Sequence, residues 1–207
     1  MSDPLDFTGK VVLVTGSSRG IGAEMIKAFG QRGAQCAVNY LPDAQGQNKA
    51  EAMKVADALV DPLVIDCDVT HPQQVEAMMK QIQEQRGGLD ILVNNSGVIS
   101  DRTIRKLTLD DFENVIRVNL VGTFNVTQKA AAILRSSGRV INMSSVSGQM
   151  GLFGQANYSE QGRDHCVNQS LGTRICPSEH HRKRDRAWFH RRRDEQGYAG
   201  RSSPKFH

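Results

Sequence analysis

The chain has 207 residues, a length that predicts one domain or one domain followed by a tail. No run approaches about 18 consecutive apolar residues, and the N-terminus has no apolar run behind a positively charged start. We therefore expect neither a membrane span nor a secretory signal, and we expect a cytoplasmic protein.

Basic charge is concentrated toward the C-terminus. Residues 160–207 hold 11 of the 26 Lys and Arg but only 6 of the 22 Asp and Glu, which gives this segment a net charge of +5. The segment has no hydrophobic periodicity, and its few apolar residues stand among charges. The sequence thus predicts a domain over 1–159 and a disordered or irregular basic tail over 160–207.

Within residues 1–159, strand-like and helix-like segments alternate. Short apolar runs predict strands over 10–16, 34–40, 62–69, 89–97 and 138–145. Apolar residues at helical spacing predict helices over 21–33, 47–59, 72–88 and 108–134. Such alternation is typical of the α/β class, so we expect a parallel sheet wrapped by helices on both faces.

The cysteines show no paired spacing. Cys36 and Cys67 lie in strand-like stretches and are predicted to be buried thiols rather than parts of a disulfide framework. No metal site is expected.

The segment TGSSRGIG, residues 15–22, lies between the first predicted strand and the first predicted helix. Gly16 permits a tight turn, Gly20 allows backbone to approach a pyrophosphate, and Gly22 allows the helix to pack close to the strand. The start of the helix offers free N–H groups to phosphate. The segment therefore predicts a dinucleotide-binding turn with these residues: Gly16, Ser17, Ser18, Arg19, Gly20, Ile21 and Gly22.

The end of the second strand bears on the choice between NAD and NADP. An acidic residue there would accept hydrogen bonds from the ribose 2′-OH of NAD. Asn39 and Tyr40 stand at this position, and neither is acidic. Arg19 in the turn can pair with a 2′-phosphate, although an exposed turn arginine is the alternative interpretation. We therefore favour NADP(H) over NAD(H) as the cofactor.

Five motifs together resemble the short-chain dehydrogenase/reductase family over residues 8–159. They are TGSSRGIG, CDV at 67–69, NNSG at 94–97, VNL at 118–120 and SVSGQMGLFGQANY at 145–158. The stretch GQANYS is most similar to that of the 3-oxoacyl-acyl-carrier-protein reductases. The resemblance implies reduction of a 3-oxoacyl thioester, carried by acyl carrier protein or CoA, to the 3-hydroxy form.

The resemblance also implies roles for individual residues. Asp68 and Val69 would contact the adenine, and Asn94 and Gly97 would hold the ribose region of the cofactor. Asn95 would also belong to the cofactor-binding residues. The implied catalytic residues are Asn119 as holder of a water for proton relay, Ser145 as hydrogen-bond donor to the substrate carbonyl, and Tyr158 as general acid.

The family pattern stops after Ser159. The family has a lysine four residues after the tyrosine, but this position is Gly162. The resemblance implies a Rossmann-like, doubly wound parallel sheet. The family's sixth and seventh strands are not readable here, so we expect strand order 3-2-1-4-5 in a sheet that lacks its last two strands. We also expect a chain that does not form the family's homotetramer. Codons permitted for the tail, read from the second base of codon 160, recover Ser-Lys-Ala-Gly and later a Pro-Gly loop. Our hypothesis is that residues 160–207 are an out-of-frame read of a reductase gene.

Two other functions compete with an active reductase. The first is a nucleotide-binding pseudoenzyme that kept the cofactor half and lost the lysine. The second is nucleic-acid binding by the basic tail, against which stand the acidic residues among its arginines and its few aromatic residues.

Overall fold

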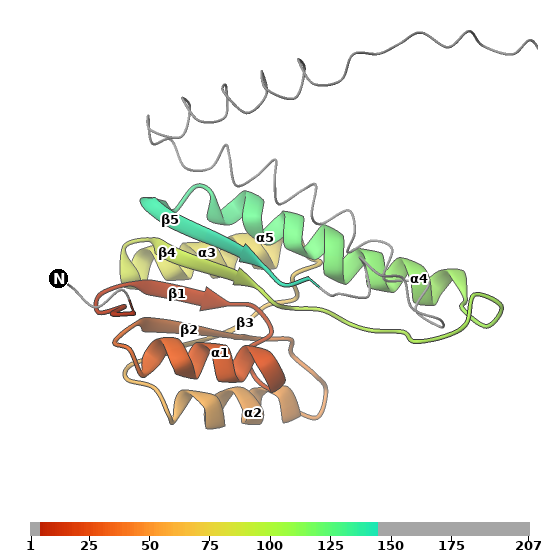
Figure 1. Cartoon of the computed structure of the whole chain (residues 1–207), viewed down its shortest axis with the longest axis horizontal. Helices are drawn as coiled ribbons and strands as arrows, with labels where there is room; N and C mark the ends of the chain where they lie inside the picture. The colour runs from red at the N-terminus through yellow and green to blue at the C-terminus, as the bar shows by residue number, and fades with distance from the viewer. Residues whose placement is uncertain (1–4, 145–207) are drawn as a thin grey trace, which may run out of the picture. The chain divides into compact units, whose positions relative to one another are not determined.

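The computed structural model describes residues 5–144 (Figure 1). The proposed tail, Ser145 and Tyr158, and any strand beyond the fifth lie outside the described residues. None of the described helices is long and apolar enough to cross a membrane.

The described residues form one five-stranded sheet in which all neighbouring strands are parallel. The strand order β3-β2-β1-β4-β5 confirms the predicted topology. The strands are β1 (Val11–Val14), β2 (Gln35–Tyr40), β3 (Leu63–Asp66), β4 (Leu89–Asn94) and β5 (Leu134–Asn142).

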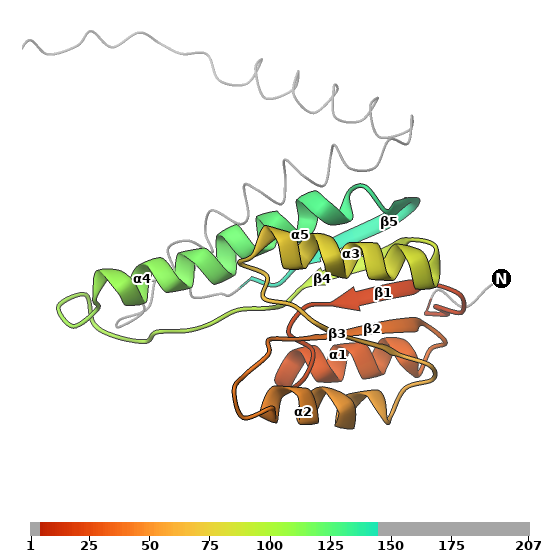
Figure 2. The ribbon, with the colours of Figure 1, turned by 180° about the vertical axis from the view of Figure 1, so that it is seen from behind.

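Helices cover both faces of this sheet, as the alternating pattern predicts (Figures 1 and 2). On one face lie α1 (Gly20–Gly30) and α2 (Gln47–Ala56), and on the other lie α3 (Pro72–Arg86) and α5 (Thr123–Ala130). Val12 and Val14 of β1 point into the first core with α1 and α2, whereas Val11 and Leu13 point into the second core with α3 and α5. Successive residues of a buried strand serve opposite faces, which is why β1 is apolar throughout.

The predicted buried thiols are confirmed at two positions. Cys36 and Cys67 are free and buried. Burial raises the pKa of Cys36 to about 11, and burial together with the nearby charges of Asp68 and Asp66 raises the pKa of Cys67 to about 12. Both thiols therefore stay protonated at neutral pH.

The single helix predicted over 108–134 is divided in the structure. It consists of α4 (Leu109–Ile116), a π-helical segment over Arg117–Gly122, and α5. Thr108 begins α4 as expected, because its hydroxyl accepts a hydrogen bond from the backbone N–H of Asp111 at 3.1 Å. Gly122 sits so close to Val69 that a Cβ there would lie 2.7 Å from that side chain. The wider π turn accompanies this close packing against the segment after β3.

The fifth strand begins earlier than the sequence predicts. A turn over 131–133 ends α5 at Ala130, and β5 starts at Leu134 rather than near residue 138. Leu134 pairs with Leu89, and an irregularity in the ladder lies between Leu89 and Ile91. Pairing of Leu134 thus starts β5 early, and the less apolar residues 135–138 lie in the irregular part of the ladder.

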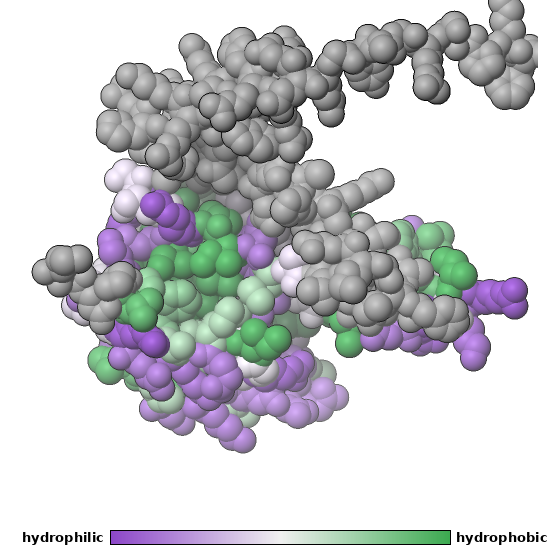
Figure 3. Space-filling model, in the orientation of Figure 1, coloured by the Kyte–Doolittle hydropathy of each residue, from purple (hydrophilic) through white to green (hydrophobic). Residues whose placement is uncertain are grey.

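One face of the sheet is covered unevenly by the described residues. In Figure 3, apolar side chains gather over β4 and β5, whereas the surface of α1 and α2 is largely hydrophilic. Ile141 of β5 is 44% exposed, and Ile91 of β4 is half-buried. On this face, α1 and α2 pack on β1, β2 and β3. Among the described residues, no helix on this face packs mainly on β4 or β5, so apolar side chains of these two strands remain partly exposed.

A buried carboxylate ties the amino ends of β1, β4 and β5 together. The side chain of Asp90 is only 6% exposed and accepts hydrogen bonds from Val11 N at 3.0 Å, from Lys10 Nζ at 3.3 Å and from Arg135 Nη1. Burial by itself raises the pKa of Asp90. The hydrogen bonds from Val11, Lys10 and Arg135, with the charge of Arg135, outweigh it, so the pKa lies below its ordinary value.

We expect Asp90→Asn to lower the free energy of unfolding by about 2–4 kcal/mol at neutral pH, because Lys10 and Arg135 lose their anion. The contribution of the carboxylate is complete above its unfolded-state pKa of about 3.9 and is lost as the pH falls through the lower folded value. Urea denaturation across the acid range should therefore show the wild type and the variant converging at low pH.

The matched control is Glu84→Gln, which removes an exposed carboxylate 3.8 Å from Lys80. This change should cost less than about 0.5 kcal/mol. A deficit of Asp90→Asn that stayed constant down to low pH would contradict the proposed ionic contribution.

Candidate functional site

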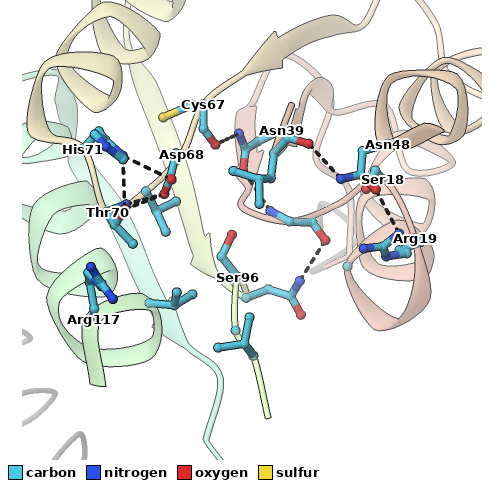
Figure 4. Close-up of a pocket in the computed structure, with 18 of the residues that line it drawn as sticks. Ser18, Arg19, Asn39, Asn48, Cys67, Asp68, Thr70, His71, Ser96 and Arg117 are labelled. Carbon is cyan, nitrogen blue, oxygen red and sulfur yellow. Dashed lines mark hydrogen bonds and ion pairs between the residues drawn. The ribbon is translucent and has the colours of Figure 1, made fainter. Parts of the chain in front are cut away.

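A cavity of about 700 Å³ lies at the carboxyl ends of β1 to β4 (Figure 4). The topology places it where ligands bind in open α/β sheets, since β1 is the strand from which the chain order runs in both directions. Ten of the residues predicted from the sequence line this cavity: Gly16, Ser18, Arg19, Ile21, Gly22, Asn39, Asp68, Val69, Asn95 and Gly97.

The turn between β1 and α1 depends on its glycines in different ways. Gly16 and Gly20 have φ angles of 62° and 58°, in the region that favours glycine. A Cβ on Gly20 would meet nothing within 4 Å, so only the backbone conformation favours glycine there. A Cβ on Gly22 would lie 2.6 Å from the carbonyl oxygen of Gly16 and 2.5 Å from Nδ2 of Asn95. The close approach predicted for Gly22 is therefore to the turn itself and to the segment after β4.

Hydrogen bonds fix this turn to the ends of two neighbouring strands. The hydroxyl of Thr15 accepts from the backbone N–H groups of Asn95 and Ser96, each at 2.9 Å, and the Asn95 side chain donates to the carbonyl of Thr15 at 2.9 Å. On the other side, Asn39 Oδ1 accepts from the N–H of Gly16 at 2.9 Å. The turn is thus held between β2 and β4.

Asn39 and Tyr40, which suggested the cofactor preference, occupy different surroundings. Asn39 is 1% exposed, and its amide also donates to the carbonyls of Ile65 and Cys67 at 3.3 and 3.2 Å. It lines the cavity and connects the ends of β2 and β3 to the turn. Tyr40 is 6% exposed and packs in the core with α1 and α2, and it is not among the residues that line the cavity.

Three further predicted cofactor residues do not line the cavity: Ser17, Gly20 and Asn94. Ser17 is buried, and its hydroxyl accepts from the N–H of Asn39 at 3.1 Å. Asn94 is buried, and its Nδ2 donates to Thr127 at 2.9 Å and to Asn142 at 2.6 Å. The buried Oδ1 of Asn94 has no hydrogen-bond partner among the described residues. Ser17 and Asn94 thus support the strands around the cavity.

Arg19 is held at one end of the cavity by α2. Its Nη1 donates to Asn48 Oδ1 at 2.9 Å and to Glu51 Oε2 at 3.1 Å. The Arg19 side chain as a whole remains 63% exposed. It therefore stands at the rim as a cation that still has contact with solvent.

Asp68 forms an ordered acidic group on the other side of Figure 4, where Thr70 and His71 are also labelled. Its Oδ1 accepts from the hydroxyl of Thr70 at 2.7 Å, and its Oδ2 lies 3.1 Å from Nδ1 of His71. Partial burial raises the pKa of Asp68. Hydrogen bonds from Thr70 and the interaction with His71 outweigh this effect and hold the pKa below its ordinary value. Asp68 is therefore an anionic acceptor at neutral pH.

Asn119, the one predicted catalytic residue that is described, lies in the π-helical segment. Its Oδ1 accepts from the N–H of Val98 at 2.9 Å, and its Nδ2 donates to the carbonyl of Val98 at 3.1 Å. Its own backbone carbonyl accepts from the hydroxyl of Thr123 at 2.6 Å. The helix is therefore irregular at this residue, and its side chain binds the chain segment that follows Gly97.

The first turn of α1 is suited to an anion. It has neither a side-chain cap nor an acidic residue, so its N–H groups and positive dipole end are not neutralised from within the turn. Nearby, Ile21 and Leu41 line the cavity although they are 68% and 52% exposed. Exposed apolar side chains in a concave wall are typical of a ligand site. The cavity can thus hold an elongated ligand with an anionic centre and apolar rings.

Sequence reasoning missed part of the cavity wall. Leu41 and Asn48 follow β2, Thr70 and His71 follow β3, and Arg117 enters from the π-helical segment. The rule that ligands bind outside the carboxyl ends of parallel strands could have indicated the residues after β2 and β3. No such signal exists for Arg117, which is far from any strand end in sequence. Among residues 5–144, no group of His, Cys, Asp and Glu is arranged to hold a metal ion.

Comparisons with known proteins agree with the predicted family and fold. The family described as short chain dehydrogenase matches residues 10–160. A protein of Staphylococcus aureus strain Mu50 named 3-oxoacyl-[acyl-carrier-protein] reductase FabG is 40% identical over 153 residues, which cover 72% of this chain and 61% of that protein. An uncharacterised oxidoreductase of Mycobacterium bovis is 38% identical over 156 residues, which cover 72% of this chain and 60% of that protein. The chain therefore spans about three fifths of the length of these relatives.

Solved structures that resemble this chain are also dehydrogenases or reductases. A short chain dehydrogenase from Mycobacterium avium is 31% identical, with a TM-score of 0.71 and coverage of 80% of this chain and 63% of that one. A dehydrogenase/reductase from Sinorhizobium meliloti 1021 is 29% identical, with a TM-score of 0.72 and coverage of 83% of this chain and 70% of that one.

We expect Gly22→Ala to lower the free energy of unfolding by about 3 kcal/mol, because the new methyl group overlaps backbone that cannot move without breaking the turn. The control is Gly46→Ala, where φ is 69° and a Cβ would meet nothing within 4 Å. Strain alone should cost about 1 kcal/mol there. Equal losses for the two variants in thermal or urea denaturation would show that close packing at Gly22 is unimportant.

Proposed function

The chain belongs to the short-chain dehydrogenase family, and on that premise we propose that residues 5–144 bind NADP(H) in the cavity at the carboxyl ends of β1 to β4. We further propose that the activity of the parent enzyme is reduction of a 3-oxoacyl thioester to the 3-hydroxy form. The chain as it stands is expected to be impaired in this reaction.

The observation that carries the proposal is the fit of the cavity to a dinucleotide. The uncapped start of α1 would provide N–H groups for the pyrophosphate, and Gly16 and Gly22 of the same turn line the cavity. The exposed apolar side chains of Ile21 and Leu41 provide surface for rings. Asp68, with Val69 beside it, offers acceptors to the adenine amino group, and Asn95 and Gly97 border the ribose region.

Two observations support NADP(H) over NAD(H). Neither Asn39 nor Tyr40 at the end of β2 is acidic, so β2 provides no carboxylate for a ribose 2′-OH. Arg19 places a guanidinium at the rim of the cavity, where a planar fork of donors suits a phosphate.

The family's catalytic residues complete the proposed site. When bound, the dinucleotide supplies the hydride. We propose that Ser145 donates a hydrogen bond to the substrate carbonyl and that Tyr158 gives its phenolic proton to the oxygen. Asn119, through the irregular helix that it occupies, would hold a water for proton relay. A phenol has an ordinary pKa of about 10, and a nearby cation is needed to bring it toward neutral pH.

The cation that should serve Tyr158 is missing from its expected place. Gly162 stands four residues after Tyr158 and has neither charge nor side chain. The family match ends at residue 160, which agrees with the point where the motif pattern stops. Both facts support the proposal that residues 160–207 are an out-of-frame read. They also support the competing proposal of a pseudoenzyme that binds nucleotide without turnover.

The substrate class rests on the relatives. The Staphylococcus aureus protein that is 40% identical is named for 3-oxoacyl-[acyl-carrier-protein], so we propose an acyl carrier protein or CoA thioester as substrate. The family's homotetramer would use parts of the chain beyond residue 159, so we propose that this chain does not form it.

Arg19→Gln should weaken NADP⁺ binding by about 10- to 100-fold and leave NAD⁺ binding almost unchanged, since a charge-assisted hydrogen bond to phosphate contributes about 1.5–3 kcal/mol. Isothermal titration with both dinucleotides checks this. The control Arg32→Gln removes an exposed guanidinium that binds the carbonyl of Ala28, and it should alter neither affinity. Equal effects of Arg19→Gln on both cofactors would refute the phosphate role.

Turnover is tested by NADPH oxidation with an acetoacetyl thioester, on this chain and on a version restored to the other reading frame. We expect the chain as it stands to be slower by about 10²–10⁴-fold, because an unactivated phenol is a poor proton donor. Retained cofactor fluorescence without turnover would identify a pseudoenzyme. Equal rates for the two versions would refute both the role of the missing lysine and the proposed frame error.

A further inference from the structure

We propose that Glu51 sets the preference of the cavity between dinucleotides with and without a 2′-phosphate, by partly neutralising Arg19. The inference rests on the proposed binding of a nicotinamide dinucleotide. It assigns to α2 a specificity-determining residue that does not itself line the cavity.

The geometry of the pair leaves Arg19 available and yet reduces its charge. Nη1 of Arg19 makes both recorded contacts, to Glu51 at 3.1 Å and to Asn48 at 2.9 Å. Its Nε and Nη2 make no hydrogen bond within the described part of the chain. One edge of the guanidinium can therefore still donate to a phosphate. The Glu51 side chain is only 28% exposed. A carboxylate with this limited access to water is poorly screened from an anion that reaches the guanidinium.

The start of α2 holds this arrangement in place. Asn48 Nδ2 donates to the carbonyl of Leu41 at 2.9 Å, which turns its Oδ1 toward Arg19. The carboxylate of Asp43 accepts from the backbone N–H groups of Gln47 at 3.0 Å and Asn48 at 2.8 Å. The first N–H groups of α2 are therefore already bound to an anion and are not free for a phosphate.

Arg19 is thus the cationic group that faces a 2′-phosphate at this end of the cavity. The other basic residues of the cavity wall in the described range, His71 and Arg117, lie across the cavity from Arg19 in Figure 4. With Glu51 ionised, Arg19 and Glu51 together carry no net charge. A 2′-phosphate dianion gains less from this pair than from a lone guanidinium, whereas the uncharged 2′-OH of NAD is nearly indifferent to it.

The test is Glu51→Gln, which removes the charge and keeps a side chain of the same shape that can still accept from Arg19. Isothermal titration of the full chain with NADP⁺, NAD⁺, 2′,5′-ADP and 5′-AMP gives the four affinities. We expect NADP⁺ and 2′,5′-ADP to bind roughly three- to tenfold more tightly, as for one partly screened charge, with NAD⁺ and 5′-AMP unchanged. The control Glu24→Gln removes a carboxylate 3.1 Å from Lys27, on α1, and should leave the ratio of affinities unchanged.

A second background shows whether Glu51 acts through Arg19. In Arg19→Gln, the further change Glu51→Gln should alter the NADP⁺ to NAD⁺ ratio by less than the single change does, because its partner cation is gone. An unchanged or reduced ratio in Glu51→Gln, while the wild type binds both dinucleotides, would overturn the inference alone. Failure of the wild type to bind either dinucleotide would refute the proposed function and the inference with it.

Discussion

The close approach of Gly22 to the backbone of the β1–α1 turn is the constraint on which the cavity depends. Because no Cβ separates them, Gly22 packs beside the carbonyl of Gly16 and the amide of Asn95. The same turn receives Asn39 from β2 and gives the hydroxyl of Thr15 to the segment after β4. Three strand ends are thereby joined around one short turn, and the start of α1 is left open above them. The site is a product of backbone geometry first and of side-chain chemistry second.

Around this centre the polar residues divide into two kinds. Ser17, Asn39 and Asn94 are buried, and their side chains form hydrogen bonds with neighbouring strands, with the turn and with α5. Arg19 and Asp68 stand at the rim and are partly exposed, and each lies 3.1 Å from an ionisable neighbour: Glu51 for the first and His71 for the second. A ligand would therefore contact charged, partly exposed side chains at the rim, and buried hydrogen-bonded side chains would support the cavity beneath it. Small changes in the second group can alter which ligand binds without altering the fold.

The opposite end of the sheet shows how the same strands are held at their amino ends. Asp90 gathers Lys10, the N–H of Val11 and Arg135, and so joins β1, β4 and β5 by ionic and hydrogen bonds. The carboxyl ends are joined instead by uncharged groups, through the hydroxyl of Thr15 and the amide side chains of Asn39 and Asn94. In α/β proteins, residues that stabilise the fold are commonly concentrated at one end of the sheet and residues that bind ligands at the other.

Local apolar periodicity and glycine spacing are properties of the chain, so they sufficed to predict the five strands and the turn with its three glycines. The family resemblance added the strand order and part of the cavity wall that follows β3 and β4, but other residues of the wall, such as Leu41 and Arg117, were not predicted. Tertiary contacts were needed to show that Tyr40 lies in the core, that the helix over 109–130 contains a π segment, and that β5 begins at Leu134. Nor could the sequence show that Glu51 forms an ion pair with Arg19. These features arise from contacts between residues distant in the chain, which pattern and propensity do not encode.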